Sequence, residues 1–160
     1  MNNEPQSEHR WLAKLVGEWE GKGEAEGPAG EGTSTWRSRQ SVRAIGELWI
    51  QCEASNEMDD GSSPSTMLIT LGYDPAQGRY VGNFVGSMMS SQWIYSGSVD
   101  AGGRSLTLDT RGPDWSTGEL RDYQDIIDIV DDNEHVLRSR MLGDDGQWQQ
   151  IMQVRYRRVS

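Results

Sequence analysis

The sequence predicts an all-β protein: a single antiparallel up-and-down barrel of about ten strands, preceded by a short N-terminal helix. Segments that alternate apolar and polar residues follow one another at nearly even spacing between residues 18 and 158. Turn-forming Gly, Asn, Asp and Pro residues separate these segments, as tight hairpins require. The 19 glycines among 160 residues also suit many turns and curved strands. Most neighbouring strands are therefore expected to pair antiparallel.

The helix is expected directly after a polar segment, residues 1–6, that should be frayed. Ser7 is placed to cap the helix, and Gly17 is placed to end it. A helix this short needs to pack against the barrel to be stable. Its apolar face consists of Trp11, Leu12, Leu15 and Val16.

One expected strand, residues 121–131, also fits an amphipathic helix, because its acidic residues recur at every third position. Its β-branched residues and the following Asp132-Asn133 turn favour a strand. Two longer loops, residues 59–64 and 112–118, have the flexible composition expected at a barrel mouth. The expected strands cover residues 18–25, 33–44, 46–57, 66–73, 78–86, 91–99, 104–111, 121–131, 134–142 and 147–158.

Trp19 gives the most specific signal about architecture. It follows Gly17-Glu18 at the start of the first expected strand, where an indole can close one end of a barrel. An arginine of the last strand, within residues 155–158, can stack on that indole as a cation–π pair. Both groups are interpreted as structural.

Composition favours one domain, residues 1–160, and limits the classes of partner. Only 34% of the residues are hydrophobic, but 7 Trp, 7 Met and 5 Tyr replace aliphatic bulk. The net charge of −10 disfavours nucleic acids and anionic membranes as partners and leaves neutral or cationic small molecules open. No apolar run reaches membrane-spanning length and no signal peptide is recognisable, so a cytoplasmic location is expected. The single cysteine, Cys52, is expected to be buried and inert.

Motifs along nearly the whole chain resemble those of a bacterial family of lipocalin-like proteins, catalogued as domain of unknown function 1579. The resemblance implies a calycin-type barrel of about ten antiparallel strands, akin to fatty-acid-binding proteins and nitrobindins. It therefore strengthens the strand interpretation of residues 121–131, and it implies no particular activity. The segments that carry it are residues 11–19, 71–75 with 78–82, 87–89 with 93–97, and 156–158.

Strand alternation predicts an aromatic barrel interior with scattered hydrogen-bonding groups. Such an interior fits a pocket for a small, partly polar molecule, whereas the competing interpretation is a core filled by Trp and Met side chains. Alternation places three sets inside: Trp36, Ser38, Gln40 and Val42; Trp93, Tyr95 and Gly97; Trp148, Gln150, Met152, Val154 and Tyr156. The candidate lining residues are Trp36, Gln40, Met88, Trp93, Tyr95, Asp125, Arg138, Gln150, Met152 and Tyr156.

Two charged positions decide how polar this interior is. If Arg138 and Arg140 face inward, they can hold a carboxylate, but the opposite parity, which puts Leu137, Ser139 and Met141 inside, is preferred. Asp125 shares the parity of apolar residues on its strand, so it is the carboxylate expected to be buried. The neighbouring aspartates of residues 122–132 are interpreted as a solvated surface.

No cofactor is expected. Haem of the nitrobindin kind needs an axial histidine on the last strand, and that strand has none. His9 and His135 are expected to be solvent-exposed, so a zinc site or a histidine-based triad lacks support. Met88 and Met89 are interpreted as adaptable apolar lining rather than as ligands of a soft metal.

Three hypotheses of function follow. The first is a non-enzymatic binder of a small, partly apolar molecule inside the barrel. The second is an enzyme that acts on a small acid or phenol, with Tyr95, Asp125 or Arg138 as acid, base or anion clamp. The third is an interaction module whose barrel is filled and whose function lies in a homodimer interface. It predicts an exposed apolar patch on the surface.

Overall fold

The computed structural model describes residues 3–27 and 32–160, so part of the segment expected to be frayed, residues 1–2, lies outside the described residues. Among the described residues, no helix has the length and apolar character needed to cross a membrane. The elements are one short helix, α1 (Ser7–Ala13), and ten strands: β1 (Gly17–Glu26), β2 (Thr33–Ile45), β3 (Trp49–Met58), β4 (Ser65–Asp74), β5 (Arg79–Gly86), β6 (Trp93–Val99), β7 (Ser105–Pro113), β8 (Leu120–Asp131), β9 (Glu134–Leu142) and β10 (Trp148–Arg158).

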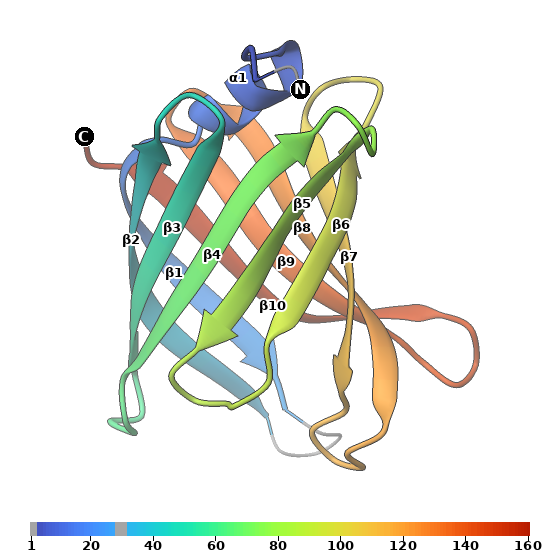
Figure 1. Ribbon diagram of the computed structural model, residues 1–160. Coiled ribbons are helices and arrows are strands. Elements are labelled where there is room, and N and C mark those ends of the chain that lie inside the picture. Colours follow the sequence, from blue (N-terminus) through green and yellow to red (C-terminus); the bar gives the residue numbers. More distant parts are fainter. Residues whose placement is uncertain (1–2, 28–31) are drawn as a thin grey trace.

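The strands form a closed barrel in which each pairs antiparallel with its sequence neighbours, and β1 pairs with β10 to complete the circle (Figure 1). Each described strand therefore has a pairing partner on both sides, and the free edge strands of an open sheet are avoided. The predicted all-β barrel is therefore confirmed, including the strand at residues 121–131 that local signals left open. Strand β3 begins at Trp49 rather than at residue 46, because Gly46 has a φ of 61° in the preceding turn.

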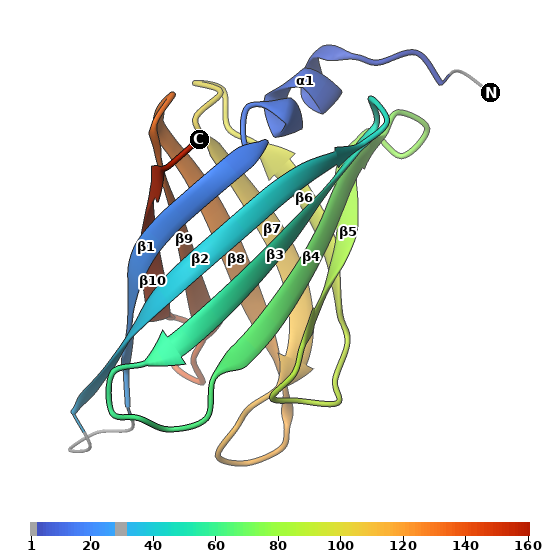
Figure 2. The same cartoon turned by 90° about the vertical axis from the view of Figure 1, so that its left-hand side faces the viewer.

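Helix α1 lies across one end of the barrel (Figures 1 and 2). Trp11 and Leu12 are buried there, and the Trp11 indole N–H donates to the carbonyl oxygen of Gly103 at 2.7 Å. Gln6 caps the helix instead of Ser7. Its backbone is extended, and its backbone N–H donates to the His9 ring nitrogen Nδ1 at 2.9 Å. The helix ends at Ala13, so Leu15 is buried as part of the link to β1.

Trp19 closes this end of the barrel as predicted. Its indole N–H donates to the carbonyl oxygen of Leu15 at 2.9 Å, and the guanidinium carbon of Arg158 lies 4.2 Å from the ring centroid. The same guanidinium donates to the carbonyl oxygens of Val16 at 2.7 Å and Lys14 at 3.0 Å. The last strand is thereby tied to the link between α1 and β1.

Below Trp19 the interior is tightly packed and carries a small buried polar network. His135 is 3% exposed, so its expected exposure is wrong: β9 begins at Glu134, and the alternation turns His135 inward. Its Nε2 atom lies 2.9 Å from Oε1 of Gln40, and its ring meets Trp19 edge-on at 4.2 Å between centroids. His9 is also buried, with its Nε2 atom 3.0 Å from the Tyr73 carbonyl oxygen, because it lies on the side of α1 that packs against the barrel.

No helix of the described residues lies over the opposite end of the barrel (Figure 2). The loops between β3 and β4, β5 and β6, β7 and β8, and β9 and β10 lie at this end (Figure 1). They include the two loops that the sequence predicts at a barrel mouth. The structure therefore has one closed end and one end bounded by loops, which we call the open end.

Candidate functional site

Inward-facing side chains change from buried to half-exposed along the barrel axis toward the open end. On β9 the series runs from buried His135 and Leu137 to half-exposed Ser139 and Met141. On β2, Gln40 and Ser38 are buried, whereas Trp36, nearer the open end, is half-exposed. Strands β4 and β10 change in the same way, to end in half-exposed Met67 and Met152. Inward-facing side chains near the open end are therefore more exposed to solvent than those in the packed half under Trp19.

The side chains that line this accessible region are large, apolar and flexible. Each is half-buried and packs against the barrel core, and none is charged. Methionine side chains adapt their shape to a partner at low cost, which suits a site that must fit one ligand or several related ligands. We call this set the mouth: Trp36, Met67, Met89, Met141, Ile151 and Met152.

A carboxyl group lies deeper than the mouth, on β8. The hydroxyl groups of Tyr95 and Ser139 donate hydrogen bonds to the two oxygens of Asp125, one to each. Burial raises the pKa of Asp125, and the two hydrogen bonds oppose that rise only in part. Burial and the neighbouring Asp125 also raise the pKa of Tyr95. Three strands thus bring a carboxyl and two hydroxyl groups together on the barrel axis.

No cation of the described chain balances this carboxyl. The arginines of the adjoining β9 face outward: Arg138 forms an ion pair with Asp128 at 2.7 Å, and Arg140 donates to Gln124 at 2.8 Å. Arg121, at the rim, is held by Asp114 at 3.0 Å and also pairs with Asp144. In the part of the chain that the structure describes, Asp125 therefore has hydroxyl partners and no ion pair.

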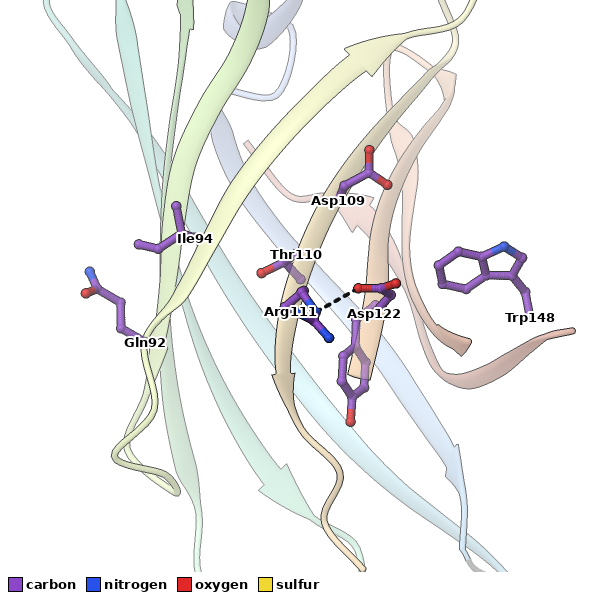
Figure 3. A pocket seen from close by; sticks show the side chains of 8 residues that line it. Gln92, Ile94, Asp109, Thr110, Arg111, Asp122 and Trp148 are labelled. Atoms are coloured by element: carbon purple, nitrogen blue, oxygen red, sulfur yellow. Dashed lines mark ion pairs between the residues drawn. The ribbon is translucent and has the colours of Figure 1, made fainter. Parts of the chain in front are cut away.

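The barrel wall separates beside this site. Pairing between β6 and β7 runs from Val99–Leu106 to Ser96–Asp109 and stops there, and Figure 3 shows the two strands diverging toward the open end. A surface groove of about 540 Å³ lies over the separation. Its lining combines outward-facing side chains with inward-parity Thr110, whose buried hydroxyl lacks a hydrogen-bond partner among the described residues. The lining residues are Gln92, Ile94, Asp109, Thr110, Arg111, Asp122, Tyr123 and Trp148.

Seven of the ten predicted lining residues face the interior, at two depths. Trp36 and Met152 belong to the mouth, and Tyr95 and Asp125 form the polar group beneath it. Trp93 is buried against Tyr123, edge-on with 4.9 Å between ring centroids. The remaining two, Gln40 and Tyr156, are sealed in the packed half, where they bond to His135 and Ser38.

Three predicted lining residues do not face the interior. Arg138 points outward, so its proposed inward role is wrong and the preferred parity is confirmed. Gln150 is exposed, and so is Trp148 at 36%, because a bulge between Gln150 and Met152 shifts the register and reverses the alternation of β10. Met88 lies on the β5–β6 loop and is 44% exposed, whereas its neighbour Met89 accepts a hydrogen bond from the Trp93 indole.

Sequence reasoning missed several members of the site. Ser139 was expected inside, but its bond to Asp125 was not, because pairing between β8 and β9 had not been fixed. Met67 alternates with buried residues and could have been found by applying to β4 the parity argument that placed Met141 inside on β9. Ile151 carries no such signal, since it faces inward only because of the bulge.

Metal and thiol chemistry receive no support from the arrangement of side chains. Among residues 3–27 and 32–160, no group of three His, Cys, Asp or Glu side chains could hold a metal ion. Cys52 is buried as predicted, and burial raises the pKa of its thiol to about 12, which keeps it protonated and unreactive.

A family model described as protein of unknown function, DUF1579, matches residues 4–158 of the chain. The chain belongs to this family. Membership confirms the predicted resemblance, and the description of the family assigns DUF1579 no activity. Comparison with the curated proteins gave no match.

Solved structures similar to this DUF1579 chain are barrel proteins of low sequence identity. Rv2717c from M. tuberculosis has a TM-score of 0.68 at 15% identity, with 98% of this chain and 100% of that chain covered. The S-type phycobiliprotein lyase CPES from Guillardia theta has a TM-score of 0.62 at 12% identity, covering 98% and 99%. EF1p2_mFAP2b bound to DFHBI has a TM-score of 0.51 at 14% identity, covering 95% and 99%. These likenesses show the fold.

Proposed function

We propose that this DUF1579 protein binds a small, largely apolar molecule at the open end of its barrel, in the cytoplasm. The observation that carries the proposal is the set of half-exposed apolar side chains facing the barrel axis above a polar group. Apolar side chains left accessible inside a concave surface gain free energy when a ligand covers them, at roughly 25 cal/mol per Å². A few fixed polar atoms then set the orientation of the ligand.

The structural neighbours support this proposal at the level of fold. One is described as an S-type phycobiliprotein lyase and another as EF1p2_mFAP2b bound to DFHBI, so at least one protein of similar fold holds a small molecule. The acidic chain and its single buried thiol support a reducing, cytoplasmic setting.

The test is binding of Nile red, a neutral apolar dye whose emission rises and shifts to the blue in apolar surroundings. We expect saturable binding by the wild-type protein and weaker binding by Met141→Trp, which fills part of the mouth. Ile94→Trp is the matched control, because Ile94 is 62% exposed on the outer face of β6. Equal binding by both variants, or no binding by the wild type, would contradict the proposal.

A second candidate function is acid catalysis on a small acid or phenol in the same place. The contact of Tyr95 with Asp125 favours it, because burial raises the pKa of this carboxyl group, the direction of shift that general acids require. Arg138 has no part in this candidate. Native mass spectrometry of protein purified from its own host separates the two functions. If the protein is an enzyme, the wild type converts the molecule it retains, so the mass of that molecule changes, whereas Asp125→Asn retains it unchanged.

A further inference from the structure

Asp125 has the surroundings of a carboxylate that receives a cation from outside the chain. The Tyr95 and Ser139 hydroxyl groups hold its two oxygens in place, and both donate to it, as they would to a charged carboxylate. A buried carboxylate is stable only when it is paired or well hydrogen-bonded. Two hydroxyl groups satisfy part of its four acceptor positions, so further donors can still be received.

Among the described residues, no cationic side chain donates to Asp125. Arg138 and Arg140 on the adjoining strand are engaged on the outside of the barrel, and Arg121 at the rim is engaged by Asp114 and Asp144. The side chains of the mouth, between Asp125 and solvent, are uncharged. A ligand that enters from the open end thus meets apolar and aromatic surfaces first and a carboxyl group last.

Charge around the open end favours the approach of cations. Three of its loops, residues 59–64, 114–119 and 143–147, together hold six acidic residues and no Lys or Arg. The loop of residues 87–92 is uncharged. Arg121 neutralises part of this charge, but an acidic excess remains on a protein that already carries a net charge of −10. Such a rim raises the local concentration of cations and repels anions.

We infer that the ligand of the mouth is an amine: an apolar, ring-containing body that carries one protonated nitrogen, which is bound by Asp125. This inference rests on the proposed function and names the ligand class. The nitrogen donates to the carboxylate, while Trp36 and the methionines cover the apolar body. The aromatic ring of Tyr95, itself bonded to Asp125, lies beside the same position.

The experiment compares three ligands that share one ring system and differ in the head group: 1-naphthylmethylamine, 1-naphthalenemethanol and 1-naphthoic acid. Isothermal titration calorimetry at pH 7 gives each affinity. We expect the amine to bind more tightly than the alcohol by on the order of tenfold to a hundredfold, the range for a hydrogen bond to a charged group. The acid should bind most weakly, because Asp125 and the acidic loops repel it.

Asp125→Asn separates the contribution of Asp125 to amine binding from that of the acidic loops at the open end. It removes the charge of Asp125 and keeps a side chain of the same shape. We expect this variant to bind the amine and the alcohol about equally. Glu53→Gln is the matched control: Glu53 is an exposed acid on the outer face of β3 and should leave the preference for the amine unchanged. Should Asp125→Asn fail to fold, a wild-type protein that shows no preference for the amine would still overturn the inference.

Two results would overturn the inference while leaving the proposed function intact: equal affinity for the three ligands, or tightest binding of the acid. A preference for the amine that survives in Asp125→Asn would also overturn it, since the rim would then suffice. Failure of the wild-type protein to bind any of the three ligands, or Nile red, would overturn the proposed function itself.

Discussion

Two ionisable side chains, the buried His135 and the half-buried Asp125, make the stability of the barrel depend on pH in opposite directions. Burial, followed by the positive charge of Arg158, lowers the pKa of His135 from 6.5 to about 4. As the pH falls from 6.5 toward 4, the unfolded chain takes up the proton before the folded chain, so stability falls. Burial raises the pKa of Asp125, so the folded chain takes up that proton first and gains stability over its own range.

The effect of His135 can be isolated by His135→Gln, which keeps a polar partner for Gln40. We expect the wild-type free energy of unfolding to fall between pH 6.5 and pH 4, with a contribution from His135 of up to roughly 3 kcal/mol. In His135→Gln that contribution should be absent. Urea unfolding midpoints measured across this range check it, and parallel curves for the two proteins would show that His135 is not the group responsible.

The position of Trp36 in the mouth depends on a single glycine. A Cβ atom added at Gly23 would lie 2.1 Å from the Trp36 ring. Gly23→Ala should therefore displace the indole, at a cost of roughly 1–3 kcal/mol in stability, and weaken Nile red binding. Gly102→Ala is the matched control, because its nearest neighbour is an Asp100 oxygen at 3.9 Å. Unchanged dye binding in Gly23→Ala would remove Trp36 from the site.

At the scale of elements, α1 and β10 are joined through one side chain, Arg158. Its guanidinium covers Trp19 and donates to the carbonyl oxygens of Val16, Lys14 and Asp132. Arg158→Ala should cost roughly 2–4 kcal/mol, the sum of a cation–π contact and charged hydrogen bonds. Thermal unfolding measures this cost.

The control for Arg158→Ala is an alanine at Arg157, the adjacent exposed arginine of β10. Hydrogen exchange should also show faster exchange of the amides of α1 in Arg158→Ala than in Arg157→Ala, because the link to β1 is released. A loss of stability of the same size in both variants would mean that general charge, rather than closure of this end, is the cause.

Strand alternation can be predicted from the sequence, whereas bulges and the register between strands cannot. Strict alternation on β2 and β6 placed Trp36 and Tyr95 correctly, because neither strand departs from a period of two. On β10 the bulge at Ile151 reverses the alternation, and no Gly or Pro marks it. Correct parity alone did not reveal the bond between Ser139 and Asp125, since it depends on the register of β9 against β8.

At the scale of the whole molecule, the six methionines of the described chain gather toward the open end. Met58 and Met141 lie at the ends of β3 and β9 there, Met88 and Met89 lie in the β5–β6 loop, and Met67 and Met152 are close by. The packed half under Trp19 contains none of them, so methionine chemistry reports on the open end alone. This separation offers a test of whether the lower interior is accessible or filled.

Dilute hydrogen peroxide applied to the native protein should oxidise Met88 first, because it is 44% exposed. Met67 and Met152 should follow at a slower, measurable rate without unfolding, because both are half-exposed. Bound Nile red should slow the oxidation of Met67 and Met152 and leave the oxidation rate of Met88 unchanged. Peptide mass spectrometry at successive times measures these rates. If Met67 and Met152 react only when urea unfolds the protein, the barrel is filled to its rim, and an interaction through its outer surface becomes the better account of function.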